Sequence, residues 1–225
     1  MTSPTNSRKA TRAPLTRKRV LRAAIKLADK HGIESLSMRK LAQALGVEAM
    51  SLYNHVANKE DVLDGIVDIV VEEIEVPAVG TDDWQAAMRQ RASSAHRVLL
   101  RHPWASMLIV SRVNIGPAML RYVNATIGCL VEAGFSYKMA DHVWNAIDSY
   151  IYGFTIQELN FPFDPSEYAD AATNYLSLVP YDKYPYLNVL AQQVIDGTHH
   201  GLHDFEFGFE LLLDGLERAR DRGEQ

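Results

Sequence analysis

Apolar residues recur at spacings of three and four along nearly the whole of this 225-residue chain. This is the period of an amphipathic helix, and no segment alternates apolar and polar positions between hairpin turns as a strand does. Cap residues such as Thr16, Ser37 and Asn58, and glycines such as Gly32 and Gly46, mark where helices begin and end. The pattern predicts an all-α fold with helices at residues 16–31, 37–45, 48–55, 58–74, 83–101, 103–113, 117–133, 136–159, 166–176, 186–196 and 203–220.

Charge divides the chain unevenly. Residues 1–62 carry 12 lysines and arginines against 5 aspartates and glutamates, whereas residues 63–225 carry 11 against 23. A basic head on an acidic body indicates that the head meets a polyanion, although a basic disordered tail would give the same count. We expect a basic arm at residues 1–14, a helix-turn-helix domain at 15–62, and a ligand-binding and dimerisation domain at 63–225.

Composition excludes several classes of protein. With 47% apolar and 23% charged residues the chain is not disordered throughout, and its apolar runs are far below the roughly 20 residues that span a bilayer. The basic N-terminus has no apolar core of a secretory signal, so a cytoplasmic protein without a membrane partner is expected. The single cysteine, Cys129, excludes an intrachain disulfide, and no sequence motif calls for a cofactor.

The head has the spacing of a helix-turn-helix. Three short helices lie within about 40 residues, and the turn Gly46-Val47 separates the last two. At roughly 100° per residue, Leu52 of the third helix faces inward with its neighbours Ala49 and Val56. The opposite and flanking positions could reach base edges and phosphates, and they are Met50, Ser51, Tyr53, Asn54 and His55.

Basic residues surround this predicted recognition helix. Arg39 and Lys40 on the second helix and Lys59 at the start of the fourth are placed for phosphates, with Arg17 and Lys18 as further neighbours. A three-helix bundle with a basic surface and no DNA partner would show the same spacing and charge. Spacing and charge alone favour double-stranded DNA as a partner, and they leave a bundle without a DNA partner open as the alternative.

Several motifs carry a resemblance to a known family. LSMRKLA at 36–42, LGV at 45–47 and SLYNHVANK at 51–59 closely resemble the head of TetR-family transcriptional repressors. GFS at 134–136, FEFGFEL at 205–211 and GLE at 215–217 are similar to the body of the tetracycline repressor, so the resemblance covers residues 15 to about 220. It implies groove or backbone contacts for Met50, Tyr53, Asn54 and His55, and base or phosphate contacts for Arg39 and Lys59.

The helices at 136–159 and 203–220 carry apolar residues on most of their circumference, and not on one face only. On pattern alone they either lie deep in the core of one chain or meet a second chain. The resemblance implies a homodimer joined through the final helices, in which Gly153, Gly208 and Gly215 would allow close approach. The expected interface residues are Ile147, Ile151, Phe154, Phe205, Phe209, Leu212 and Leu216.

The middle helices are expected to enclose a cavity for a small-molecule effector. Its candidate lining residues are Trp104, Met107, Leu108, Ser111, Arg112, Trp144, Asn145, Asp148 and Tyr152, although a solvated face or ordinary core would give the same pattern. Walls of tryptophan and methionine suit an apolar or aromatic effector. The tetracycline repressor reads a magnesium–drug complex through histidines, and the matching stretches here, 72–75 and 108–110, contain none.

Metal binding and catalysis have little support. The histidines His199, His200 and His203, near Asp196 and Asp204, could ligate a metal, but such a Gly-rich loop is more typical of solvated histidines, and no metal site is predicted. No nucleophile elbow, P-loop or dinucleotide fingerprint occurs. The sequence therefore predicts a ligand-responsive repressor released from a palindromic operator. The alternatives are an orphan receptor without specific DNA recognition, and an enzyme on a borrowed fold.

Overall fold

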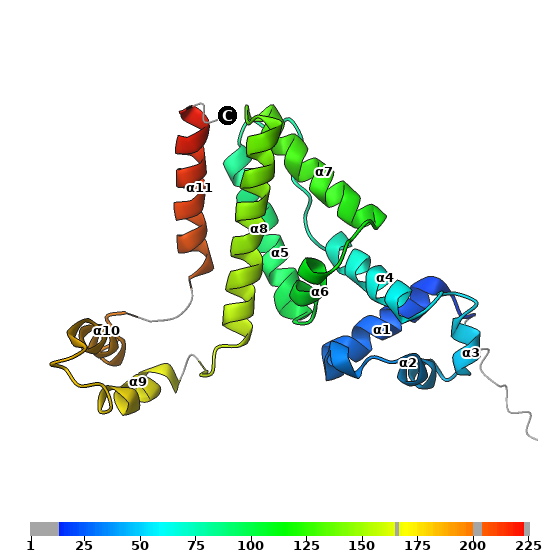
Figure 1. Ribbon diagram of the computed structural model, residues 1–225, viewed down its shortest axis with the longest axis horizontal. Coiled ribbons are helices and arrows are strands. Elements are labelled where there is room, and N and C mark those ends of the chain that lie inside the picture. Colours follow the sequence, from blue (N-terminus) through cyan, green and yellow to red (C-terminus); the bar gives the residue numbers. More distant parts are fainter. Residues whose placement is uncertain (1–13, 165–166, 200–203, 223–225) are drawn as a thin grey trace, which may run out of the picture.

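The computed structural model describes residues 14–164, 167–199 and 204–222, and helices are its only regular secondary structure within these ranges (Figure 1). The all-α prediction is confirmed. The elements are α1 (Arg17–His31), η1 (Ile33–Ser35), α2 (Met38–Leu45), α3 (Ala49–Leu52), α4 (Lys59–Glu72), α5 (Trp84–Arg101), α6 (Ala105–Ser111), α7 (Pro117–Glu132), α8 (Tyr137–Leu159), α9 (Tyr168–Leu176), α10 (Pro185–Ile195) and α11 (Phe205–Asp221).

The helix starts follow the caps that the sequence predicts. The side chains of Thr16, Ser37 and Asn58 each accept a hydrogen bond from a backbone N–H three residues on. Gly46 ends α2 in the left-handed region at φ 66°, a conformation that side chains other than glycine rarely adopt. Local chemistry therefore sets the boundaries of the first helices.

The observed helices depart from the predicted ones most clearly in three places. The helix predicted at 48–55 is shorter, because after α3 the residues up to His55 form a turn. The helix predicted from Pro103 begins at Ala105, since residues 102–104 turn at the end of α5. The 3-10 helix η1, which follows Gly32, was not predicted.

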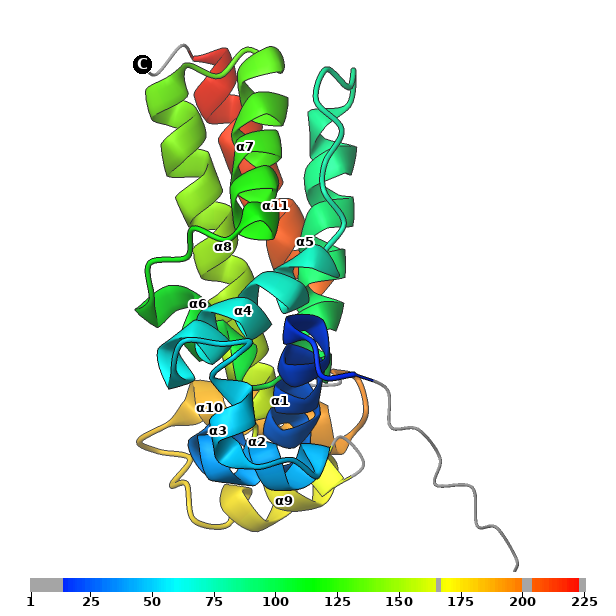
Figure 2. The ribbon, with the colours of Figure 1, turned by 90° about the vertical axis from the view of Figure 1, so that its right-hand side faces the viewer.

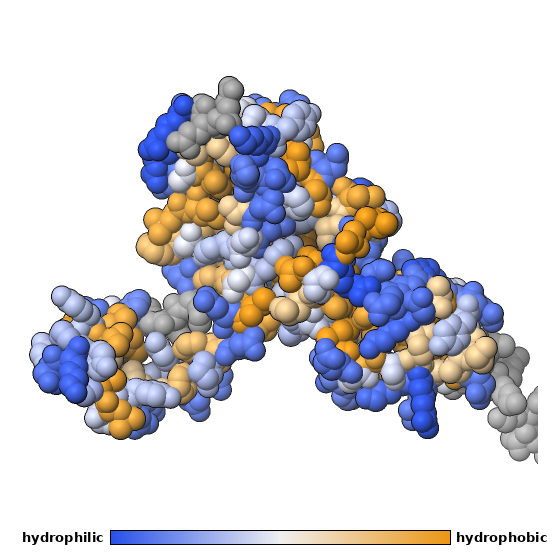
Figure 3. Space-filling model, in the orientation of Figure 1, coloured by the Kyte–Doolittle hydropathy of each residue, from blue (hydrophilic) through white to orange (hydrophobic). Residues whose placement is uncertain are grey.

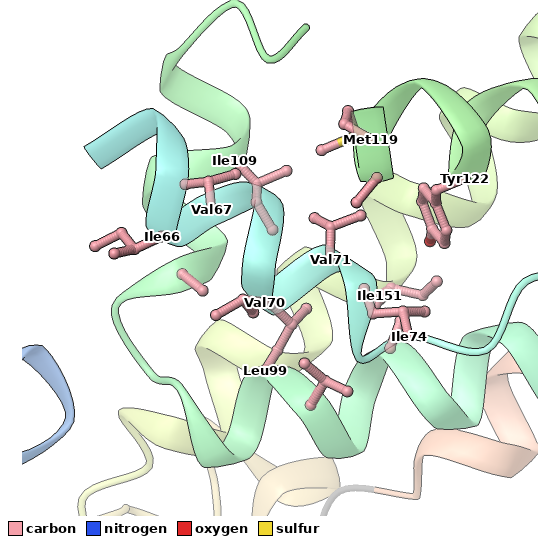
Figure 4. Close-up of a cluster of buried hydrophobic side chains, with 14 of the residues drawn as sticks. Ile66, Val67, Val70, Val71, Ile74, Leu99, Ile109, Met119, Tyr122 and Ile151 are labelled. Carbon is pink, nitrogen blue, oxygen red and sulfur yellow. The ribbon is translucent and has the colours of Figure 1, made fainter. Parts of the chain in front are cut away.

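Helix α4 joins the head to the body. It packs on α1 of the head and on α6 and α7 of the body (Figure 2). In Figure 4 the apolar side chains of α4, among them Val67, Val70 and Val71, meet Leu99 and Met119 from the body. The boundary expected between residues 62 and 63 falls inside this helix, so the two parts of the chain share it.

The body is a bundle of long helices. Helix α8 packs against α5, α7 and α11, and α11 also contacts α5. Gly208 on α11 lies so close to α8 that an added Cβ would stand 2.4 Å from the hydroxyl oxygen of Tyr150. That hydroxyl donates to the backbone carbonyl of Phe205 at 2.9 Å, which fixes the start of α11 on α8.

Helices α9 and α10 form an arm that stands away from the bundle (Figure 1). They pack mainly on each other, no residue of α9 is buried, and Val194 is the one buried residue of α10. Apolar side chains lie on the surface of the arm (Figure 3), and Leu187 of α10 is 58% exposed. In the described part of the chain, no helix combines the length and apolarity needed to cross a membrane.

Candidate nucleic-acid interface and ligand cavity

The third helix presents its polar and aromatic residues outward. Met50 is 75% exposed and Tyr53 45% exposed, and Asn54 is also exposed. Ser51 and His55 are half-buried beside them. Leu52 and Val56 are buried and Ala49 is half-buried on the other side. This orientation agrees with the helical spacing, and contact with DNA remains a prediction.

Basic side chains lie around this face. Arg39 and Lys40 are exposed in the first turn of α2, and Lys59 is exposed at the first residue of α4. On α1 the predicted Lys18 is continued by Arg22 and Lys26, which were not predicted; the three follow at four-residue spacing and line a shallow groove. The spacing itself was the available signal, because residues four apart share one face of a helix.

Arg17 has a structural role within the head, and its place beside a phosphate stays a prediction. Its guanidinium donates two hydrogen bonds to the carboxylate of Asp61, at 2.7 and 2.6 Å, and a longer one to the carbonyl of His55 at 3.4 Å. The same carboxylate accepts the backbone N–H of Ala57 at 2.8 Å. The hydrogen bonds from Arg17, opposed by burial and helped by Ala57, lower the pKa of Asp61. The pair fixes the turn that follows α3 against α1 and α4.

A cavity of about 420 Å³ lies between α6, α7 and α8. Five of the nine predicted ligand residues line it, namely Arg112, Trp144, Asn145, Asp148 and Tyr152. The lining residues that were not predicted are Ile109, Val110, Asn114, Met119, Val123 and Ser149. The structure thus brings the predicted residues of α8 together with Arg112, and adds polar groups from the segment before α7.

The other four predicted residues do not line this cavity. Met107 and Ser111 are exposed on the outer side of α6, and Leu108 is half-buried against the hydrophobic core. Trp104 is buried, and its indole Nε1 donates to Asp29 of α1 at 2.7 Å. Placing these four in the ligand site was therefore wrong for this cavity, because the short α6 turns only part of its surface toward α8.

A buried polar network stands behind the cavity wall. Arg91 of α5 has a fully buried side chain and forms an ion pair with Oδ1 of Asp148. The other carboxylate oxygen, Oδ2, accepts hydrogen bonds from Trp144 Nε1 at 2.8 Å and from the Tyr152 hydroxyl at 3.3 Å. The guanidinium carbon of Arg91 also lies 4.5 Å from the centre of the Tyr122 ring.

The network keeps each donor protonated. Burial alone lowers the pKa of a guanidinium, but Tyr122 and Asp148 more than offset this and raise the pKa of Arg91. Burial, and then the carboxylate of Asp148, raises the pKa of Tyr152 well above its ordinary value. Arg91 was not predicted, although it interrupts the apolar row of α5 three residues after Met88 and four before Ala95. A cation on the buried face of a helix was the signal.

Arg112 connects the cavity to α4. Its side chain lines the cavity, while Nη1 donates to Glu60 at 2.6 Å and Nη2 to Asp64 at 2.7 Å. One turn further along α4, Asp68 Oδ1 accepts the backbone N–H groups of Ala118 and Met119 at 2.9 and 3.0 Å. A carboxylate at this position caps the positive end of α7. The carboxylates of α4 therefore hold the segment that forms one side of the cavity.

A second set of contacts joins the head to the end of α5. His102 Nδ1 lies 2.8 Å from Asp29 Oδ1, which also accepts the indole N–H of Trp104. His102 is 7% exposed, and Glu73 of the α4 C-terminus lies 3.6 Å from its Nε2. The head is thus tied to the body at both ends of α4.

Most of the predicted dimer residues belong to the core of one chain. Ile147 and Ile151 are fully buried, and Phe205 and Phe209 are buried as well, with Phe205 stacked on His96. The prediction that these four face a partner helix is wrong, because apolar neighbours of the same chain already cover them. The remaining three are half-buried against the core and are Phe154, Leu212 and Leu216.

The histidine loop and the cysteine offer no site in the described residues. His199 is exposed, whereas His200 and His203 lie outside the described residues. In the ranges that are described, no group of three or more histidine, cysteine, aspartate or glutamate side chains could hold a metal ion. Burial raises the pKa of the Cys129 thiol, so the reactive thiolate form is disfavoured.

Comparison with known proteins gives a consistent result for both parts of the chain. Residues 20–66 match the family model of bacterial regulatory proteins, tetR family. Residues 76–220 match the model of the tetracyclin repressor-like C-terminal domain. The second match alone covers more than half of the chain.

Individual relatives agree with these matches. A transcriptional regulator of Saccharopolyspora erythraea is 36% identical over 64% of this chain and 61% of its own length. The transcriptional repressor DrrR1 of Streptomyces coeruleorubidus is 31% identical over 96% of this chain and 84% of its own. The structure of ActR from Streptomyces coelicolor in complex with actinorhodin superposes with a TM-score of 0.77 at 30% identity, covering 92% of this chain and 99% of ActR.

Proposed function

The chain belongs to the tetR family of bacterial regulatory proteins, and on that premise we propose that it represses transcription from a palindromic operator until a small molecule enters its cavity. It is a DNA-binding transcriptional regulator and not an enzyme. The relative DrrR1 is named a repressor, and ActR was crystallised with actinorhodin. The exposed face of α3, with Arg39 and Lys59 beside it, is the surface that we assign to the operator.

The observation that carries the regulatory part of the proposal is the double role of Arg112. One side chain lines the cavity and also binds Glu60 and Asp64 in the first turns of α4. A ligand that displaces this guanidinium frees the end of α4 nearest to the recognition helix. The ligand shifts the DNA-binding equilibrium only by the difference between its affinities for the two geometries.

We propose a homodimer on grounds that differ from the predicted interface. On α11 the exposed apolar residues are Phe207, 65% exposed, and Leu211, 58% exposed one turn later. The α9–α10 arm buries almost nothing within its own chain. Large apolar surfaces of this kind mark contacts with another molecule. Two heads related by a twofold axis would read two half-sites about one DNA turn apart, which makes the operator a palindrome.

The effector that we propose is aromatic, with hydrogen-bonding groups on its edge. The cavity has apolar walls from Val110, Met119 and Trp144, and Asn114 and Ser149 add polar groups that the sequence did not indicate. In addition, Oδ1 of Asn114 is buried without a hydrogen-bond partner among the described residues. A ligand N–H or O–H group would satisfy this acceptor once the Asn114 side chain turned its oxygen toward the cavity.

Selection of bound DNA from a random pool tests the DNA-binding part of the function. We expect a palindromic consensus, and a gel shift with the DNA upstream of the gene should then give a sequence-specific complex. A compound screen for release of that DNA tests the regulatory part. Binding of random and selected DNA with equal affinity would instead favour the orphan receptor. Since a bacterial regulator must reach its DNA, we place the protein in the cytoplasm.

A further inference from the structure

We infer that Arg91 decides which ligand charge the cavity accepts: by neutralising Asp148 from behind the wall, it makes the cavity select neutral aromatic ligands and reject cations. Arg91 itself does not line the cavity and touches no ligand. The inference rests on the proposed function only in taking this cavity as the effector site. Its test uses protein without DNA, so it can fail or succeed independently of repression.

The geometry separates the two oxygens of one carboxylate. Oδ1 of Asp148 is held by Arg91, whose side chain is 0% exposed. Oδ2 accepts hydrogen bonds from Trp144 and Tyr152, and both of these residues line the cavity. Asp148 therefore presents to the cavity an oxygen whose negative charge is already balanced and whose orientation is fixed from two sides.

Burying the ion pair of Arg91 and Asp148 costs free energy, and a stabilising role does not account for its presence. Nε and Nη1 of Arg91 are buried without a hydrogen-bond partner among the described residues. The face of the Tyr122 ring compensates the guanidinium only in part. Replacing such a pair by apolar residues of similar size is often neutral or stabilising, so the pair itself is weak evidence for a stabilising role. A role in the adjoining cavity accounts for the charge.

The remaining charge on the cavity wall is also paired, with carboxylates that lie exposed outside the cavity. Arg112 is the other charged residue that lines the cavity, and it is paired with Glu60 and Asp64 on its outer side. A cation that entered would lose its hydration and find Asp148 already neutralised, which is unfavourable. A neutral ligand can instead donate to Oδ2 of Asp148 or to Oδ1 of Asn114. Without Arg91, the carboxylate of Asp148 becomes an unpaired counter-ion and the cavity accepts cations.

A matched pair of fluorescent dyes tests this inference. Nile red is neutral, and Nile blue is a cationic dye of nearly the same shape. For the wild type we expect Nile red to bind at least about 10-fold more tightly than Nile blue. Arg91→Met should shift this preference at least about 10-fold toward Nile blue, and Arg91→Met combined with Asp148→Asn should restore it. Ser149→Trp, which fills the cavity, should remove the binding of both dyes to this site.

If a thermal melt shows that Arg91→Met is unfolded, a second variant that removes the negative partner of the ion pair keeps the test decisive. Asp148→Asn leaves Arg91 as an excess positive charge, so we expect weaker Nile blue binding and a gain of affinity for the anion anilinonaphthalene sulfonate. An unchanged dye preference in every folded variant would overturn the inference. The inference would also be overturned if the double variant kept the dye preference of Arg91→Met. It would likewise be overturned if Ser149→Trp bound Nile red as tightly as the wild type does.

Discussion

Arg112 and Asp64 are joined by two hydrogen bonds, from Nε and Nη2 of the guanidinium to the single carboxylate oxygen Oδ1, at 2.9 and 2.7 Å. Asp64 lies on α4, which starts beside the recognition helix, and Arg112 lines the ligand cavity. We propose that a change in the cavity reaches the head through the ion pairs of Arg112 with Asp64 and Glu60, because both carboxylates lie on the helix that starts beside α3.

Replacing Arg112 should uncouple the ligand from DNA. In Arg112→Gln the side chain keeps its polarity but loses the ion pairs with Glu60 and Asp64. Allosteric coupling typically amounts to about 1–3 kcal/mol, and we expect most of it to be lost while operator affinity without ligand stays within a few-fold of the wild type. Operator affinity is measured with and without an effector from the screen. Arg121→Gln is the matched control, since Arg121 lies 3.8 Å from Glu72 with both side chains exposed. If the effector still released Arg112→Gln completely from the operator, Arg112 would not carry the coupling.

Substitutions on the exposed face of α3 should weaken DNA binding and leave the stability of the protein unchanged. Tyr53→Ala and Asn54→Ala should each weaken operator binding by about 1–3 kcal/mol, because both side chains are exposed beside the buried Leu52. Gel shifts give the affinities, and thermal melts should show little change. Tyr137→Ala, an exposed tyrosine of the body, is the control and should leave DNA binding unaffected. Wild-type affinity in both head variants would remove α3 from the interface.

Assembly should depend on the exposed face of α11. We expect Phe207→Asp or Leu211→Asp to give folded monomers, because each charge would face an apolar partner surface while the core of the chain stays intact. Phe209→Asp should instead unfold the protein, since its ring is 2% exposed within one chain. Sedimentation measures the mass and circular dichroism the fold. Leu120→Asp, an exposed position on α7, serves as the control. A wild type that remains monomeric at micromolar concentration would rule out the homodimer.

The sequence predicted features that depend on local chemistry. The caps at Thr16, Ser37 and Asn58 and the turn at Gly46 are set by residues within one helical turn, so reading them needs no tertiary information. The outward direction of Tyr53 likewise follows from its angle to neighbouring apolar residues. The cavity residues of α8 could be grouped for the same reason, since they share one helical face.

Features that depend on partners distant in the sequence were misread. Apolar periodicity marks Ile151 and Phe209 as buried, but it does not say whether the covering surface belongs to the same chain or to a second one. Arg91 pairs with a residue 57 positions away, and nothing in its own neighbourhood names that partner. The charge of Arg17 suggested a phosphate contact, and nothing near it in the sequence indicated its partner Asp61, 44 positions away.

The stability of the head should depend on pH through Asp61. Because Arg17 lowers the pKa of Asp61 below its ordinary value of 3.8, the pair stabilises the folded head above that value. The contribution is lost as the pH falls through the lower, folded pKa. Both side chains are partly exposed, so we expect at most about 1 kcal/mol at neutral pH. The difference in unfolding free energy between wild type and Asp61→Asn should be constant from pH 7 to about 4.5 and shrink below pH 4. A gap that widens in acid would contradict this sign.

Salt should weaken DNA binding steeply, and the residues of the head should account for the dependence. If each subunit of a dimer neutralises three or four phosphates, the log–log slope of affinity against salt should be near −6, at about −0.9 per phosphate. Lys59→Ala removes one such contact, so it should weaken operator and random DNA alike and flatten the slope by about one unit per subunit. Arg39→Ala should lose more on the operator than on random DNA if it reaches a base edge. Lys183→Ala, between α9 and α10, is the control and should leave the slope unchanged. Two results would contradict this prediction. One is DNA binding that does not change with salt between about 50 and 200 mM, and the other is a changed sequence preference in Lys59→Ala; either would show that Lys59 does not act through a phosphate.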